Sequence, residues 1–218
     1  MSTGVVEHEV ARQGWVWSAL RSPVSTALVA LLFGLFAYSH VASWLAGGHF
    51  TGLVFALQES VLVVLFLTRR RTKAVSQNPT DWVAGFVGTF LCLLLRPVGT
   101  PAIAGLDELF FALQLTGAAL SLVAAMHLGR SFGIIAANRG VKDTGVYGIV
   151  RHPLYAAYIF SHLGYLLSAP SLWNMAILGM TWLAMFRRIT AEEQVLQRDP
   201  AYRSYAARVR FRLIPELY

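Results

Sequence analysis

Residues 139–158, RGVKDTGVYGIVRHPLYAAY, form a polar, turn-rich and multiply charged stretch between long apolar runs. In this stretch Arg151 and His152 directly precede Pro153, which suits the first turn of a helix because its missing N–H needs no partner there. A helix N-terminus carries free N–H groups and partial positive charge, and Arg151 adds a fork of donors for a carboxylate or phosphate. The stretch therefore predicts a binding site for a small charged ligand. Three tyrosines add hydroxyl groups and flat faces to it: Tyr147, Tyr155 and Tyr158.

A second charged cluster lies beyond two short apolar runs, residues 153–169 and 171–187, which are joined at Pro170. A hairpin of these runs would bring both clusters to the same side, where the first offers donors for a carboxylate and the second offers carboxylates for an ammonium or ribose hydroxyls. A zwitterionic ligand suits such a pair better than a simple anion does. The second cluster consists of Arg187, Arg188, Glu192 and Glu193.

The composition indicates an all-α integral membrane protein. The chain is 56% hydrophobic and 13% charged, with a mean hydropathy of +0.55, whereas soluble domains carry about 25% charged residues. A soluble helical domain with an unusually large core is the alternative. Runs of spanning length predict six transmembrane helices, the last two being a short hairpin at the lower limit of length. We expect them near residues 24–46, 51–68, 82–96, 107–128, 153–169 and 171–187.

The distribution of positive charge predicts the orientation of these spans. With both termini in the cytoplasm, 17 of the 18 Lys and Arg residues lie on the cytoplasmic side, and Arg96 alone lies outside. Basic residues collect on that side of membrane proteins. The net charge of +7 is then explained by loops that face anionic lipid head groups. No nucleic-acid partner is therefore predicted.

The chain divides into two parts. Residues 1–128 form a polar N-terminal arm and four spans, and residues 129–218 form the region that carries the chemistry. In its tail, residues 188–199 are expected to form a separate helix, because Thr190 and Glu193 have the spacing of a capping box. After Pro200 the stretch AYRSYAARVRF predicts a cytoplasmic amphipathic helix that lies against the bundle or the membrane surface.

Other chemistries find little support in the sequence. The single Cys92 excludes an intrachain disulfide, and no spacing typical of a zinc site or of a dinucleotide-binding loop is present, so no metal is predicted. Ionisable residues within the spans are often functional, but pairing or hydrogen bonding inside the bundle is the simpler explanation for most of them. These residues are His40, Glu59, His127 and His162.

Four motifs together resemble the isoprenylcysteine carboxyl methyltransferase and phospholipid methyltransferase superfamily. The combination of RHPxY at 151–155 with a downstream EExxL at 192–196 is the most specific part, and the likeness covers about residues 127–215. Val146, where many members have Pro, and Ala157, near a common Gly, depart from the pattern. The motifs are Gly145-x-Tyr147-x-x-Val150-Arg151-His152-Pro153-x-Tyr155, Glu192-Glu193-x-x-Leu196, Tyr202-x-x-Tyr205, and Val209 followed by Ile214-Pro215.

The resemblance implies a multi-span enzyme that uses S-adenosylmethionine, in a pocket closed by the last spans and the C-terminal helix. It implies that Arg188 lies in the substrate site, and we take Arg188 and Glu192 as the candidate catalytic residues. The candidate cofactor-binding residues are Tyr147, Arg151, His152, Pro153, Tyr155, Glu192 and Glu193.

The predicted reaction is methyl transfer to a lipophilic acceptor at the membrane, on the pattern of isoprenylcysteine carboxylate O-methylation. A carboxylate or thiolate acceptor needs no general base, whereas an amine must lose a proton, for which Glu192 or His152 could serve. Lipid-amine N-methylation and small-thiol S-methylation are therefore alternatives. A nicotinamide-dependent reductase resembling sterol reductases, and a non-catalytic membrane protein of the same fold, are rivals by fold analogy. The oligomeric state is left open.

Overall fold

The computed structural model describes residues 23–46, 51–70, 72, 74–96 and 101–216. This part of the chain is mostly helical, as predicted, and its one sheet is an antiparallel pair of two-residue strands. The N-terminal arm lies outside the described residues. The elements are α2 Pro23–Leu45, α3 Thr51–Thr68, β1 Ala74–Val75, α4 Pro79–Phe90, α5 Asp107–Leu128, β2 Ala137–Asn138, α6 Pro153–Ser168, α7 Leu172–Leu196 and α8 Pro200–Arg208.

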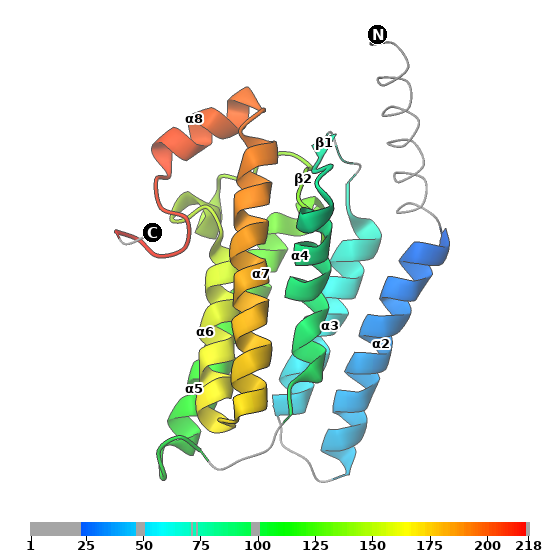
Figure 1. Cartoon of the computed structure of the whole chain (residues 1–218), viewed down its shortest axis with the longest axis vertical. Helices are drawn as coiled ribbons and strands as arrows, with labels where there is room; N and C mark the ends of the chain where they lie inside the picture. The colour runs from blue at the N-terminus through cyan, green and yellow to red at the C-terminus, as the bar shows by residue number, and fades with distance from the viewer. Residues whose placement is uncertain (1–22, 47–50, 71, 73, 97–100, 217–218) are drawn as a thin grey trace.

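Six of these helices, α2 to α7, run alongside one another as a bundle (Figure 1). α6 packs mainly along α5, α7 along α4 and α2 along α3. The α5–α6 contact is especially close, since a Cβ atom at Gly117 would collide with the backbone of Ser161, and one at Gly164 would collide with the backbone of Gln114. α8, the β1–β2 pair and the C-terminal tail all lie at one end of the bundle (Figure 1).

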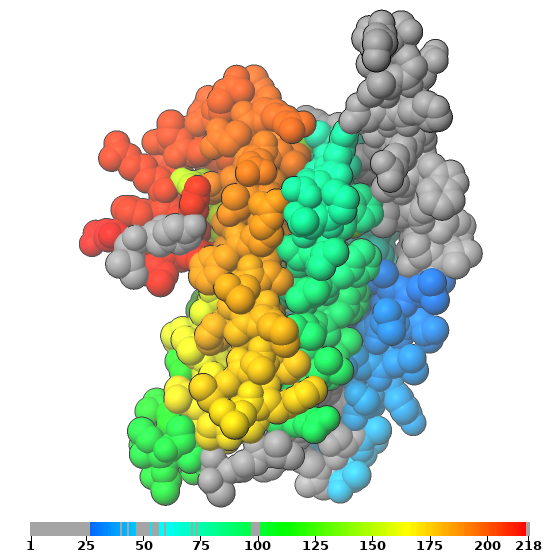
Figure 2. All heavy atoms as spheres, in the orientation of Figure 1, coloured from blue at the N-terminus to red at the C-terminus, as the bar shows by residue number. Residues whose placement is uncertain are grey.

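The helices follow the predicted spans closely, and α5 has the predicted bounds. Within the described residues, one helical stretch, Asp107–Ser131, is long and apolar enough to cross a membrane, and Ala27–Ser39 and Pro79–Leu94 are shorter apolar helices. Large apolar side chains lie exposed on the outer faces of the bundle, among them Leu183 at 72%. Figure 2 shows the face on which α7 lies beside α4.

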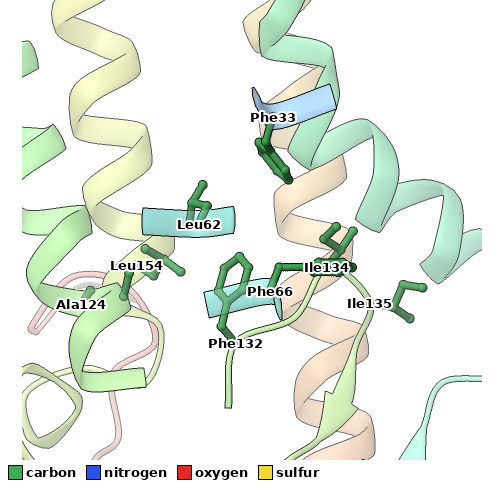
Figure 3. Packing of buried hydrophobic residues seen from close by; sticks show 9 residues of the cluster. Phe33, Leu62, Phe66, Ala124, Phe132, Ile134, Ile135 and Leu154 are labelled. Atoms are coloured by element: carbon green, nitrogen blue, oxygen red, sulfur yellow. The ribbon is translucent and has the colours of Figure 1, made fainter. Parts of the chain in front are cut away.

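The largest apolar cluster fixes the loop between α5 and α6 to the bundle. Phe132, Ile134 and Ile135 of this loop are buried against α2, α3, α5 and the start of α6, so the segment is part of the core (Figure 3). The pairing of β1 with β2 holds the next residues of the loop beside the segment that precedes α4. The polar stretch that follows is thereby positioned by packing on one side and by strand pairing on the other.

The predicted break near residue 188 is wrong. α7 continues through it to Leu196 as one helix of 25 residues. Thr190 caps nothing, because its hydroxyl donates to the carbonyl of Phe186 one turn earlier at 3.1 Å. The third span also differs, since α4 begins at Pro79, capped by Asn78, and ends in a 3₁₀ turn over Leu91–Leu94.

Candidate functional site

A pocket opens at the end of the bundle that carries β2 and α8. Its walls come from the ends of α5, α6 and α7, from the loop between α5 and α6, and from α8. The empty space inside it, including the part open to solvent at its mouth, is about 730 Å³. Of the predicted site residues, six line this pocket: Tyr147, Arg151, His152, Tyr155, Arg188 and Glu192.

Glu193 is the centre of an ion-pair network behind the pocket wall. Its Oε1 accepts from Arg151 Nε at 2.8 Å and lies 3.2 Å from His152 Nε2, and its Oε2 accepts from Arg212 Nε at 2.9 Å. Burial opposes ionisation of Glu193, but the hydrogen bonds and charges of His152 and Arg151 outweigh it and lower the pKa of Glu193 to about 2. Glu193 is therefore ionised at neutral pH and joins three segments of the chain.

The C-terminal tail completes this network. After α8 the chain returns along the start of α6, where the backbone N–H groups of Arg151 and His152 donate to the carbonyls of Phe211 and Arg212 at 2.9 and 2.8 Å. The Arg151 side chain also donates to the carbonyls of Val209 and Arg210. The Nε and Nη1 groups of Arg151 are thus occupied by protein acceptors. The sequence analysis missed Arg212, for which the only signal was its place in the Val209 to Pro215 motif.

Glu192, the next residue of α7, belongs to a different network that faces the pocket. Its Oε1 accepts from Tyr155 Oη at 2.5 Å and from Arg188 Nε at 3.2 Å. Its Oε2 has only His152 Nδ1 near it, at 3.9 Å, among the contacts of the described residues. One carboxylate oxygen therefore keeps capacity for a ligand.

Arg188 is buried in the pocket wall. Its Nη1 donates to Thr89 Oγ1 at 3.1 Å and its Nη2 to the carbonyl of Gly133 at 2.5 Å, so it ties α7 to α4 and to the α5–α6 loop. Its guanidinium carbon lies 5.4 Å from the centre of the Tyr155 ring. Arg187, by contrast, lies outside the pocket and pairs with Asp81 of α4 at 2.5 Å.

α8 closes one side of the pocket and fastens the polar loop. Tyr205 donates its hydroxyl to the carbonyl of Tyr147 at 2.8 Å, and Asn138 donates to Asp199, the N-cap residue of α8, at 2.9 Å. Of the two predicted positions of α8, the one against the bundle is confirmed, because Tyr202 and Tyr205 pack with Val209 as a buried cluster next to Leu196 of α7. Burial, followed by the charge of Glu192, raises the pKa of Tyr147, so this hydroxyl stays protonated.

The other residues singled out in the sequence lie at helix ends or inside the bundle, or outside the described residues. Pro153 is the first residue of α6, as predicted, and His152 precedes it as the N-cap residue. His127 lies exposed at the end of α5, outside the residues that line the pocket. His162 lies inside the bundle, where Trp182 donates to its Nδ1 at 3.2 Å. The side chains of His40 and Glu59 lie outside the described part of the structure.

The pocket, with the Glu192 carboxylate and its arginines, coincides with a segment of recognisable family sequence. Residues 110–198 match the isoprenylcysteine carboxyl methyltransferase (ICMT) family. The match covers α6, α7 and nearly all of α5, and it confirms the resemblance carried by the RHPxY and EExxL motifs. ICMT proteins are integral membrane methyltransferases, which supports both a membrane location and methyltransferase activity. The match ends before α8, so the tail motifs lie outside it. A comparison with curated proteins gives no significant match.

Proposed function

We propose that this protein is an S-adenosylmethionine-dependent methyltransferase that acts on a lipophilic acceptor at the cytoplasmic surface of a membrane. The observation that carries the proposal is a pocket with fixed charges of both signs, built from the segment that matches the ICMT family, at the end of an apolar bundle. The acceptor class we favour is a carboxylate of the isoprenylcysteine type. Lipid amines and small hydrophobic thiols are the alternative acceptors.

The pocket residues fit the proposed cofactor. S-Adenosylmethionine, when bound, supplies an activated methyl group on a sulfonium and carries a carboxylate, an ammonium and ribose hydroxyls. Glu192 Oε2 is available to the ammonium or to the hydroxyls, and Tyr147 and Tyr155 give flat walls beside it. Pro153 and Glu193 form the framework behind this wall, and Arg151 and His152, which also line the pocket, are held in place by Glu193 and the tail. Their contribution to cofactor binding is therefore to hold the pocket shape and its charge.

Arg188 and Glu192 are the residues that we place nearest the reaction. A guanidinium held by Thr89 and Gly133 is already oriented, so it can align an acceptor carboxylate without losing further freedom. Transfer to a carboxylate requires no proton to be removed. For an amine acceptor, Glu192 could take the proton, since His152 lies behind it against Glu193.

We further propose that α2 to α7 cross the membrane as six spans with both termini in the cytoplasm. Each of these helices overlaps one of six apolar runs of the sequence, and 17 of the 18 Lys and Arg residues then share the cytoplasmic side. The pocket lies at the end that this orientation assigns to the cytoplasm. A water-soluble cofactor would reach it from that side, and a lipophilic acceptor would reach it from between the helices.

Calorimetric titration of the purified full chain with S-adenosylmethionine and, separately, with NADPH tests the proposal. We expect saturable binding of S-adenosylmethionine and no binding of NADPH. Binding of NADPH alone would indicate the reductase alternative, and binding of neither ligand would indicate a non-catalytic protein. Methyl transfer from labelled cofactor to a farnesylated cysteine, a phosphatidylethanolamine or a hydrophobic thiol would then identify the acceptor class.

A further inference from the structure

Arg139, the residue after β2, is a charged residue of the pocket with no role in the proposed binding of cofactor and acceptor. It lines the pocket with Tyr147, Arg188 and Glu192. Its backbone is fixed on both sides, because Ser131 donates to its carbonyl at 3.3 Å and the following Gly140 donates to the Asn138 side chain at 2.9 Å. The orientation of Arg139 is therefore set by the fold of the loop.

The loop makes room for the Arg139 guanidinium at Gly133. A Cβ atom at Gly133 would overlap the guanidinium, so only glycine allows the side chain to lie there. The carbonyl of the same glycine accepts from Arg188. Two guanidinium groups therefore converge on one residue of the pocket wall, which is costly unless their charge is balanced.

The charge of Arg139 is poorly balanced by protein groups. Among the described residues no carboxylate forms an ion pair with it, its Nε is buried without a hydrogen-bond partner, and its one hydrogen bond is a long one, 3.4 Å from Nη1 to the carbonyl of Ile135. Burial, followed by repulsion from Arg69, lowers the pKa of Arg139 to about 10, so the group is still charged at neutral pH. Buried charged groups are normally paired. Arg139 therefore keeps donors from which an anionic group of a ligand could accept.

We propose that Arg139 binds the carboxylate at the amino-acid end of the methyl donor, an inference that rests on the proposed function. The amino-acid end carries a carboxylate and an ammonium a few bonds apart. Arg139 and Glu192 line the same pocket and attract each other electrostatically, and Glu192 keeps one oxygen available. The two side chains therefore present opposite charges to the two ends of a zwitterion.

The position of Arg139 favours the donor over the acceptor as the source of the anion. Arg139, Gly140 and Lys142 come from the polar loop after β2, whereas Leu128 and Leu154 come from the ends of α5 and α6 in the bundle. A lipophilic acceptor belongs on the apolar side, next to the bundle. An amino-acid group belongs where polar groups from the loop can reach it.

The test compares two ligands and three variants of the full chain in detergent. The ligands are S-adenosylhomocysteine and its decarboxylated analogue, which keeps the adenosine and the amine but lacks the carboxylate. The variants are Arg139→Met, Arg139→Lys and the control Arg130→Met, whose exposed arginine at the same end of the bundle bonds only to the carbonyl of Thr68 among the described residues. Affinities are measured by calorimetry, and folding is checked by thermal unfolding without ligand.

We expect Arg139→Met to weaken S-adenosylhomocysteine binding roughly 10- to 150-fold, as for one lost charge-assisted hydrogen bond. The decarboxylated analogue should bind the variant and the wild type equally, and Arg130→Met should change neither affinity. Without ligand, Arg139→Met should unfold at or above the wild-type temperature, because an unbalanced buried charge has been removed.

The assignment is overturned if the two ligands differ by less than about fivefold in their loss of affinity. If Arg139→Met does not fold, the same criterion is applied to Arg139→Lys, which keeps the charge but loses the fork of donors. A wild-type protein that binds neither ligand would refute the proposed function, and this assignment with it. A wild-type protein that binds both ligands, while the variants show no selective loss, would refute the assignment alone.

Discussion

Replacing Glu193 by Gln removes one charge from the centre of the network that joins α6, α7 and the tail. The substitution keeps the shape of the side chain and one carbonyl acceptor. It leaves Arg151 and His152, which are 10% and 5% exposed as side chains, without a compensating anion. We expect Glu193→Gln to destabilise the protein and to loosen the tail from the start of α6.

Two independent estimates give the size of the effect. Breaking one side of a buried ion pair costs about 3–5 kcal/mol, and the lower value applies because Arg212 is 35% exposed and can be solvated by water. The pKa of Glu193 is lowered from 4.5 to about 2, and at about 1.4 kcal/mol for each pH unit this corresponds to about 3 kcal/mol. For a chain of this length, such a loss lowers the unfolding temperature by roughly 6–12 °C.

The assay is unfolding in detergent micelles followed by circular dichroism, with Asp143→Asn as the matched control. Asp143 pairs with Arg208 at 2.8 Å, the same distance as Arg151 to Glu193, but both partners are exposed. An exposed pair contributes less than about 1 kcal/mol. The same chemical change, from carboxylate to amide, should therefore have little effect at position 143.

Acid pH supplies a second signature. Because the pKa of Glu193 is lowered in the folded state, its contribution is fully present above the unfolded pKa of 4.5 and is lost as the pH falls through about 2. The difference in stability between the wild type and Glu193→Gln should therefore shrink by about half at pH 3. The reasoning is refuted if Glu193→Gln resembles Asp143→Asn at pH 7, or if its deficit is unchanged at pH 3.

Three further outcomes are expected. Arg188→Lys keeps the positive charge but loses the planar set of guanidinium donors. It should leave S-adenosylmethionine affinity within about threefold, while turnover falls much further. A parallel loss of affinity and turnover would mean that Arg188 binds the cofactor or stabilises the folded structure. Gly117→Ala should destabilise the protein by roughly 1–3 kcal/mol, because the new Cβ atom would collide with the backbone of α6. The control Gly179→Ala has open space around it and should be neutral or slightly stabilising in the same unfolding assay. Thr72→Cys, on a Cys92-free background, should react with an impermeant thiol reagent only when the cytoplasmic side is accessible, and labelling from outside alone would overturn the proposed topology.

The helices were predictable because apolar length and local signals agree along most of the chain. Asp107 begins α5 and Pro153 begins α6, as their sequence contexts indicated. The Thr190–Glu193 pattern misled because the spacing of a capping box also occurs inside helices, and neither Pro nor Gly interrupts the chain between Gly179 and Pro200. With no residue to break it, the helix continues as far as Leu196.

The sequence predicted most of the residues that line the pocket, but it did not predict which of them contact one another. A hairpin brings residues 147–155 and 188–193 together whatever their exact contacts, which is why most of the predicted residues line the pocket. The inward direction of Arg139 depends on the space at Gly133 and on the pairing of β2 with β1, both of which are set by distant parts of the chain. The same is true of the tail, whose carbonyls accept from Arg151 Nη1.

Glu192 and Glu193 are adjacent in α7, but they have different partners because they lie on different sides of the helix. Consecutive residues of an α-helix point about 100° apart, so Glu192 and Glu193 face different sides of α7, and His152 lies between them with one ring nitrogen near each. Glu193 points towards Arg151, His152 and Arg212 and is fully occupied there. Glu192 points into the pocket, where one of its oxygens is held by Tyr155 and Arg188 and the other remains available. Because Glu193 neutralises Arg151 and Arg212, Glu192 is the carboxylate that we propose to act on a ligand.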